Sequence, residues 1–259
     1  MPDSRTDLNA GEIARARSRR REARRQKPTA LPILAVFILL GIVTFLYSPA
    51  FDVREVTVKG NAYFSEQEVI ELARVPESRN MLLVRSEGII ERILMAPRME
   101  SAEIRKRYPS RMEITVKERT TVAYLPYGGF FIDMDEKARA IGVSEAITDP
   151  NVPIITGIVP TFVLLGGTVE PAAEAQLASM LGTELTMGKV PGISEVNVKD
   201  MQDIVIITND GSRIMLGASD GIAVRLAMAL DILSGARARK QAFKYIDVRV
   251  AERPVLGTK

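Results

Sequence analysis

The 259-residue chain contains no cysteine and no histidine, and aromatic residues make up only 5% of it. Without cysteine there is no disulfide framework, so the folded part must be stable by core burial alone. Without cysteine and histidine, most zinc sites and the Ser-His or Cys-His pairs of nucleophilic catalysis are excluded. Acid–base chemistry would have to come from carboxylate or lysine side chains, because no imidazole is present.

Apolar residues are scarce in the first 27 positions, which hold nine basic and four acidic side chains. Such a charged segment cannot bury enough surface to offset the entropy lost on ordering, so we predict a basic, disordered tail over residues 1–29. Clustered arginines neutralise nucleic-acid phosphates, but they also mark the cytoplasmic flank of a membrane span. The sequence that follows favours the second interpretation.

A long apolar stretch comes next: residues 30–47 read ALPILAVFILLGIVTFLY, eighteen positions without a charge. At 1.5 Å per residue they would extend roughly 27 Å, close to the ~30 Å hydrocarbon core of a bilayer. Basic residues precede the stretch and acidic residues dominate after it, which places the N-terminus in the cytoplasm. We therefore predict a single transmembrane helix over residues 30–48, with the remainder outside the cytoplasm.

A cleaved signal peptide is the alternative, because Ser48-Pro49-Ala50 resembles a small-x-small cleavage site. However, the apolar stretch is longer than the ~7–15 residues usual for a signal peptide, and the charged segment before it is very long. An uncleaved signal-anchor is the favoured interpretation. The rest of the chain is exported in either case.

The first exported segment has the pattern of a small α/β module. A strand is predicted over 53–59, followed by a Gly60-Asn61 turn. Ser65 and Glu68 form a capping box for a helix that stops before Pro76, and a second helix runs from Ser86 to before Pro97. Strands are predicted over 99–107 and 111–118, where Met112, Ile114 and Val116 alternate with polar residues. This order predicts two helices on one face of a three-stranded sheet.

From about residue 122 the pattern changes to short apolar runs separated by Pro and Gly. Helices are predicted over 171–187 and 220–234, the second closed by Gly235. Strands are predicted over 192–198, 203–208 and 213–216, the last two joined by an Asn209-Asp210-Gly211 hairpin. Two further strands, 243–250 and 253–256, end the chain. The sequence thus predicts an α+β protein whose second domain is mostly β with two helices.

Few residues point to chemistry. Asp133 and Asp135 could form a DxD metal or nucleotide site, but a turn after a strand, with 135–137 solvated, is the favoured interpretation. Gly166-Gly167 lacks the Lys-Ser/Thr of a phosphate loop and is interpreted as a turn. Ser179 and Ser194 lack a nucleophile-elbow motif. We predict no catalytic, metal or cofactor site. The Arg105-Lys106-Arg107 run is interpreted as a solvated strand end, with contact to a partner or to lipid headgroups as the alternative.

Several motifs, in this order, resemble those of the bacterial cell-division family FtsQ, called DivIB in Gram-positive bacteria. The residues that carry the resemblance are Asp52 to Asn61, Tyr108-Pro109, Ile114 to Arg119, Phe130 to Asp133, Val152 to Gly157, Asp210 to Gly217 and Tyr245 to Arg249. The resemblance implies a polypeptide-transport-associated (POTRA) domain over 51–120 and a family-specific β domain over 121–257. Thr120-Thr121 departs from the family, which usually has proline there, and residues beyond Arg249 follow no single family pattern.

The strand pair at the C-terminus is the candidate site. An edge strand exposes unpaired backbone groups, which is either a purely structural feature or a docking site for another chain. The resemblance favours docking: it implies a non-enzymatic scaffold of the divisome in the cytoplasmic membrane at the septum. Its implied partners are FtsB/FtsL (DivIC)-type proteins and, through them, the septal wall synthase FtsW/FtsI. The predicted partner-binding residues are Tyr245, Asp247, Arg249, Val250, Arg253 and Val255.

Two other functions remain open. A membrane-anchored POTRA chaperone or secretion factor would bind unfolded exported polypeptides, but the sequence shows one such module and no barrel-like length. A tethered cell-wall enzyme would need catalytic groups, and the sequence offers neither histidine nor cysteine nor an evident carboxylate cluster.

Overall fold

The computed structural model describes residues 30–76 and 79–258, so the predicted tail lies outside the described residues. The chain divides into two compact units. The first comprises residues up to Glu55 together with 76–84 and 107–111, and the second comprises 56–75, 85–106 and 112 onward. Each unit is described by itself.

The first unit is built on helix α2, which spans Ala30–Leu46 and contains no charged residue. Its large apolar side chains are exposed along the helix, for example Phe37 and Leu39. A single 3-10 turn, η1, follows at Pro49–Phe51. Within residues 30–76 and 79–258, no helix combines the length and the apolarity needed to cross a membrane.

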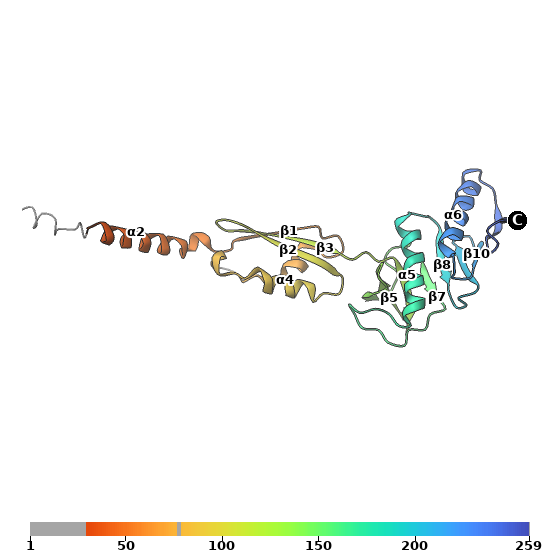
Figure 1. Cartoon of the computed structure of the whole chain (residues 1–259), viewed down its shortest axis with the longest axis horizontal. Coiled ribbons are helices and arrows are strands. Elements are labelled where there is room, and N and C mark those ends of the chain that lie inside the picture. Colours follow the sequence, from red (N-terminus) through yellow and green to blue (C-terminus); the bar gives the residue numbers. More distant parts are fainter. Residues whose placement is uncertain (1–29, 77–78, 259) are drawn as a thin grey trace, which may run out of the picture. The chain divides into compact units, whose positions relative to one another are not determined.

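The predicted α/β module is present. Its elements are β1 (Glu55–Lys59), α3 (Glu66–Ala73), η2 (Met81–Leu83), α4 (Ser86–Leu94), β2 (Met99–Arg107) and β3 (Arg111–Glu118), and the sheet order is β1-β3-β2 (Figure 1). The capping box is confirmed: the Ser65 amide donates to the Glu68 carboxylate at 2.8 Å. Hydrogen bonds from the Ser65 side chain and then its backbone lower the pKa of Glu68. The alternating residues of β3, Met112, Ile114 and Val116, are buried.

The second domain contains one sheet and two helices. Its elements are β4 (Ala123–Tyr127), β5 (Phe130–Met134), β6 (Ala140–Ser144), β7 (Ile154–Thr156), α5 (Ala172–Met187), β8 (Ile193–Asn197), β9 (Ile204–Thr208), β10 (Arg213–Gly217), α6 (Ile222–Ala238), β11 (Phe243–Asp247) and β12 (Val255–Thr258). The nine strands lie in the order β12-β11-β10-β9-β8-β7-β4-β5-β6. The predicted α+β architecture, with a mostly β second domain and two helices, is confirmed.

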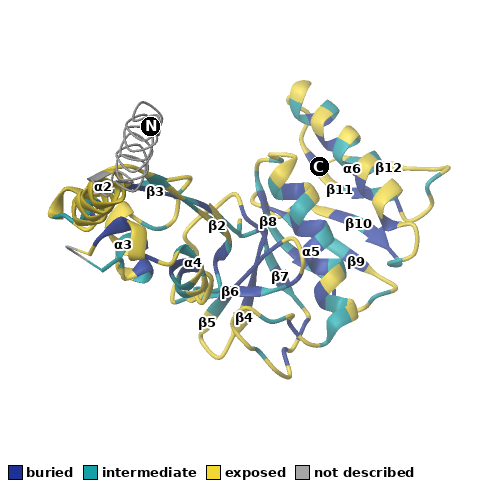
Figure 2. Ribbon diagram, turned by 60° about the vertical axis from the view of Figure 1, so that its left-hand side comes forward, coloured by how far each residue is buried: buried dark blue, intermediate teal, exposed yellow. Residues whose placement is uncertain are grey.

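The core of this domain lies between the helices and one face of the sheet (Figure 2). From the helices, Leu181 of α5 and Leu226 and Leu233 of α6 are buried. From the sheet, Ile206 and Ile246 are buried as well. Since side chains alternate along a strand, the neighbours of Ile206 on β9 and of Ile246 on β11 point to the opposite face of the sheet.

Three predicted elements at the C-terminal end have other bounds in the structure, one of them the last strand, predicted over 253–256 and found at Val255–Thr258. Helix α6 continues through Gly235 to Ala238, because good helix formers follow and the Arg237 guanidinium donates to the Pro191 carbonyl at 2.5 Å. The strand predicted over 243–250 ends at Asp247. There the Arg249 amide donates to the Asp247 carboxylate at 3.0 Å, which turns the chain toward β12.

Candidate interaction surface

The terminal hairpin places an unprotected strand at one edge of the sheet. β12 is the last strand in the sheet order and pairs antiparallel with β11, which in turn runs parallel to β10. The six predicted partner-binding residues lie in three positions. Tyr245 and Asp247 are on β11, Val255 is on the edge strand, and Arg249, Val250 and Arg253 are in the connecting turn.

Three of the six share one face of the sheet. Tyr245 lies opposite Gly257, and Asp247 lies opposite Val255. Directly paired residues project to the same side, and the side chains of Tyr245, Asp247 and Val255 are all partly or fully exposed. The residue between them, Ile246, is buried in the core. The structure therefore brings these three together, and of the turn residues Arg249 binds one of them, Asp247.

Gly257 is a member of this surface that the sequence analysis missed. A Cβ atom at this position would overlap three carbon atoms of the Tyr245 ring, so the tyrosine ring lies directly over the glycine. An aromatic ring across from a glycine shields the otherwise exposed backbone of the partner strand. The last strand was predicted over 253–256, so Gly257 fell just beyond it, and a lone glycine does not reveal its cross-strand partner.

The turn is held by an ion pair. The Arg249 guanidinium donates to both carboxylate oxygens of Asp247, with Nε–Oδ1 at 3.0 Å and Nη2–Oδ2 at 2.7 Å. These hydrogen bonds, followed by the one from the Arg249 amide, lower the pKa of Asp247. Arg249 and Asp247 thus bind each other in the described structure, and Val250 next to them is exposed.

The exposed face continues inward from the hairpin. The register aligns Tyr245 with Arg213, Arg213 with Ile207, and Ile207 with Glu195. All four side chains are partly or fully exposed. A second row of paired residues crosses the sheet beside the first, from Val255 through Asp247, Met215 and Val205 to Asn197. The edge strand is therefore continuous with a face that offers aromatic, aliphatic and charged groups side by side.

The predicted DxD pair precedes a turn after β5, as expected, and the Asp135 carboxylate accepts hydrogen bonds from the amides of Lys137 and Arg139. Asp133 and Asp135 are both buried, so the prediction that Asp135 is solvated was wrong. Asp133 forms an ion pair with Arg98, and Asp135 accepts from Arg119 at 3.1 Å. Each carboxylate is thus neutralised by an arginine that directly flanks β2 or β3. A salt bridge of this kind explains the motif without a metal ion.

Further contacts surround this pair of ion pairs. The Arg98 guanidinium lies 3.9 Å from the centre of the Tyr63 ring and donates to the Thr121 hydroxyl at 3.0 Å. Thr121 is one of the two residues that stand where the resembling family usually has proline, and here its hydroxyl is used. Glu118 accepts hydrogen bonds from the backbone amides of 62–64, the shortest from Tyr63 at 2.6 Å.

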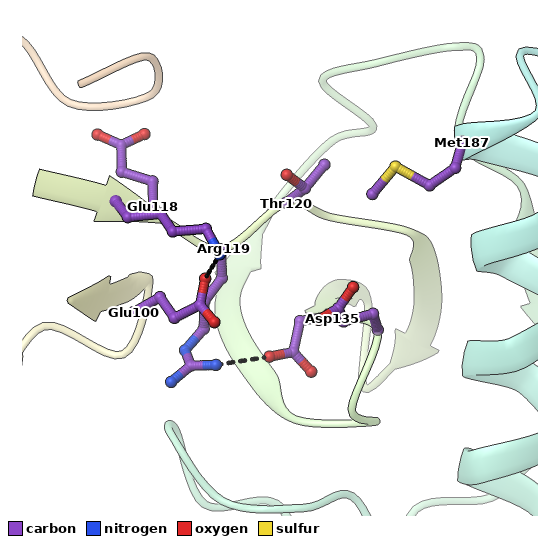
Figure 3. Close-up of a pocket in the computed structure, with 8 residues that line it drawn as sticks. Glu100, Glu118, Arg119, Thr120, Asp135 and Met187 are labelled. Atoms are coloured by element: carbon purple, nitrogen blue, oxygen red, sulfur yellow. Dashed lines mark hydrogen bonds and ion pairs between the residues drawn. The ribbon is translucent and has the colours of Figure 1, made fainter. Parts of the chain in front are cut away.

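A pocket of about 180 Å³ lies beside these residues (Figure 3). Arg119 reaches across it to Asp135, and Met187 borders it from the end of α5 (Figure 3). Glu100 also lines the pocket and pairs with Lys117 at 2.7 Å, which lowers the pKa of Glu100. The charged side chains named here bind one another. We therefore interpret this pocket as a structural gap beside β2, β3 and the end of β5.

The other residues weighed for chemistry have structural contacts. The Ser179 hydroxyl is buried and donates to the Asp135 carbonyl at 2.9 Å, and that of Ser194 donates to the Ile207 carbonyl at 3.1 Å. The Gly167 amide donates to the Leu164 carbonyl at 2.8 Å, which confirms a turn. In the part of the chain that the structure describes, no group of three or more acidic side chains is placed to hold a metal ion.

Comparison with known proteins defines the class first. Residues 51–119 match the family model described as "POTRA domain, FtsQ-type". This match covers the elements from the end of η1 through β3, so the module is a POTRA domain of the FtsQ type.

Similarity to whole proteins extends further. Cell division protein DivIB of Clostridium botulinum (strain Loch Maree / Type A3) is 23% identical over 236 residues, covering 90% of this chain and 92% of the relative. Cell division protein FtsQ of Anaeromyxobacter sp. (strain K) is 27% identical over 211 residues, covering 78% and 71%. FtsQ of Mycobacterium tuberculosis (strain H37Rv) is 28% identical over 195 residues, covering 74% and 58%.

Among solved structures, the major extracytoplasmic domain of DivIB from Geobacillus stearothermophilus matches with 17% identity and a TM-score of 0.32, covering 44% of this chain and 96% of that one. The resemblance to the FtsQ/DivIB family of cell division proteins is confirmed by the POTRA match and the relatives. The names of these relatives support a role in bacterial cell division.

Proposed function

We propose that the protein is a non-enzymatic, membrane-anchored scaffold of the division machinery at the septum. Its terminal hairpin binds FtsB/FtsL (DivIC)-type partners and connects them to septal peptidoglycan synthesis by FtsW/FtsI. The observation that carries the proposal is the edge strand β12, which is continuous with an exposed face of the sheet. The similarity to relatives named as cell division proteins supports it.

Binding by strand addition needs two components. Backbone groups along the outer side of β12 supply a row of hydrogen bonds, and alternate side chains supply register and specificity. The first component is the edge itself. The second is the exposed face around Tyr245, where the aromatic ring, Val255 and Arg213 lie close along the ladder. Aromatic and arginine side chains carry most of the binding free energy in protein interfaces.

The anchoring part of the proposal relies on α2. Its 17 residues correspond to roughly 26 Å and by themselves fall short of a membrane-crossing helix, so the proposal takes the predicted span of residues 30–48 as a whole as the anchor. An exposed helix without charges would be unfavourable in water, whereas lipid would cover it. Arginines preceding α2 in the sequence favour a cytoplasmic N-terminus, which leaves the POTRA and β domains outside.

The experiment is co-purification of the full-length chain with FtsB/FtsL-type proteins from the same genome. We expect the full chain to retain the pair, and a chain lacking residues 255–259 to lose it. Tyr245→Ala should lower affinity about tenfold or more, as for interface anchors. Tyr127→Ala is the matched control: Tyr127 is also an exposed strand tyrosine but lies on β4, six strands from β12 in the sheet order.

Two results would contradict the proposal in different ways. Retention of the partners by the chain without 255–259 would reject the edge strand and leave the scaffold role standing. Failure of the folded full chain to bind would reject the scaffold role, and binding to unfolded exported polypeptides would then favour the POTRA chaperone.

A further inference from the structure

Exposed apolar and aromatic side chains surround the end of helix α2 within the first unit. Tyr47 follows the helix and is 62% exposed. Leu82 and Leu83 of η2, and Tyr108 in the turn between β2 and β3, are exposed as well. These four side chains belong to three segments that are distant in sequence, yet all belong to one compact unit.

Hydrogen bonds connect these segments to the helix end. The Asn80 side-chain amide donates to the Leu46 carbonyl at 2.7 Å, which satisfies an orphan carbonyl of the last helical turn. The Arg54 guanidinium donates to the Pro49 carbonyl at 3.1 Å. The amides of Arg54 and Glu55 both donate to the Ser110 carbonyl, at 3.0 and 3.3 Å. The segments 52–55, 79–83 and 107–111 therefore form a collar around the residues that leave α2.

The collar carries an excess of positive charge among its described residues. Arg54, Arg79, Arg107 and Arg111 are all exposed there, against Asp52 and Glu55. Arg111 pairs with Glu55 at 2.8 Å, and Arg107 also has an interaction partner. Arginine binds phosphate oxygens with its planar guanidinium group. Tyrosine is enriched at the headgroup level of membranes, where its hydroxyl contacts water and its ring contacts lipid.

We propose that this collar docks on the headgroup layer of the bilayer face from which α2 emerges. The inference rests on the proposed anchoring of α2. The occupant follows from continuity: the collar contacts residues 46–49 directly, and each headgroup layer extends roughly 5–8 Å beyond the hydrocarbon core. Tyr47, Leu82 and Tyr108 insert at the interface, and Arg54 and Arg79 bind lipid phosphates. The collar is then held against the membrane.

The test uses the absence of tryptophan from the chain. Three full-length variants each carry one tryptophan. Tyr108→Trp introduces the collar tryptophan, Phe37→Trp the helix tryptophan in α2, and Tyr127→Trp the reference tryptophan at the exposed end of β4. Each variant is reconstituted in vesicles containing phosphatidylglycerol, with lipids brominated near the headgroup or deep in the acyl chain. Circular dichroism confirms that each variant is folded.

The proposal predicts that the collar tryptophan is quenched by shallow bromines more than by deep ones. The helix tryptophan is expected to be quenched by the deep bromines. Replacing Arg54 and Arg79 with serine in the Tyr108→Trp protein should reduce the shallow quenching, and so should neutral phosphatidylcholine vesicles. The helix tryptophan should not respond to either change.

The outcomes separate the two proposals. A quenched helix tryptophan with an unquenched collar tryptophan would overturn the collar and leave the anchor standing. An unquenched helix tryptophan would overturn the anchor and the collar that rests on it. Equal shallow quenching of the collar and reference tryptophans would show unspecific adsorption and also overturn the collar.

Discussion

Single residues explain why the DxD pattern of this chain is not a metal site. Asp133 and Asp135 form the pattern of a metal site, but each carboxylate is bound by an arginine, and both are buried. Burying a carboxylate costs free energy unless a counter-charge and hydrogen bonds compensate it. The second hydrogen bond to Asp133 comes from the Ser144 hydroxyl at 3.2 Å. Each buried carboxylate therefore depends on its arginine, and removing that arginine should be costly.

We predict that Arg98→Met lowers the free energy of unfolding by about 3–5 kcal/mol, because it leaves the buried Asp133 carboxylate unpaired. Urea denaturation of residues 51–259, followed by circular dichroism, measures the change. Arg105→Met is the control, since Arg105 pairs with Glu103 on the surface, where ion pairs contribute about 0–1 kcal/mol. Adding Asp133→Leu to Arg98→Met should recover part of the loss. Equal effects of Arg98→Met and Arg105→Met would contradict this role.

A second prediction at the residue scale concerns pH. Arg249 lowers the pKa of Asp247 below its ordinary value, so the stabilisation by this pair is present above pH ~4 and is lost as pH falls through the lowered pKa. The chain has no histidine, so partner affinity should be constant between about pH 5 and 8. Asp247→Asn should mimic the acid state at neutral pH and speed hydrogen exchange of the Arg249 amide. A strong pH dependence of binding near pH ~6.5, arising from this chain, would contradict the assignment.

At the scale of elements, local sequence signals located the helices and the strands before residue 120 and after residue 190, but they did not predict β4, β5, β6 and β7 as strands. The capping box at Ser65, the alternation in 111–118 and the hairpin at 209–211 each encode their geometry within a few residues. Two of the errors fell where distant contacts decide the outcome. Helix α6 passes Gly235 because Arg237 binds a carbonyl 46 positions away, and Asp135 is buried because Arg119 reaches it. Neither contact has a local signature.

The candidate surface was predictable only in part for the same reason. A terminal edge strand follows from the order of elements, and the resemblance pointed to residues 245–255. The face it joins depends on the register of β9, β10 and β11, which periodicity alone does not fix. Gly257 and Arg213 were missed because their roles are defined by the neighbour across the ladder.

We predict that Gly257→Ala displaces the Tyr245 ring, since a Cβ atom there would overlap it. The ring is the far end of a movable side chain, so the domain should stay folded while partner affinity falls. Thr258→Ala, one residue away on β12, is the control and should leave affinity unchanged. Thermal denaturation and binding to the FtsB/FtsL-type pair separate the two effects. Normal affinity of a folded Gly257→Ala protein would show that the position of this ring does not matter for binding.

At the scale of the whole molecule, the features point to a protein that positions others. An apolar helix with a basic sequence before it, an FtsQ-type POTRA domain and a β domain with an open edge follow one another along the chain. The candidate catalytic groups have structural contacts, and the similar proteins are named for cell division. Function would then depend on where the edge strand is held and on what pairs with it.

The most direct measurement of that claim is amide hydrogen exchange of residues 255–258, read by NMR with and without the bound partner pair. In a strand, successive amides point to opposite sides, so β11 already protects alternate amides of β12 in the free protein. Strand addition predicts that the remaining alternate amides become protected when the partner binds. Full occupancy by the partner with no gain of protection along β12 would contradict edge-strand pairing as the mechanism.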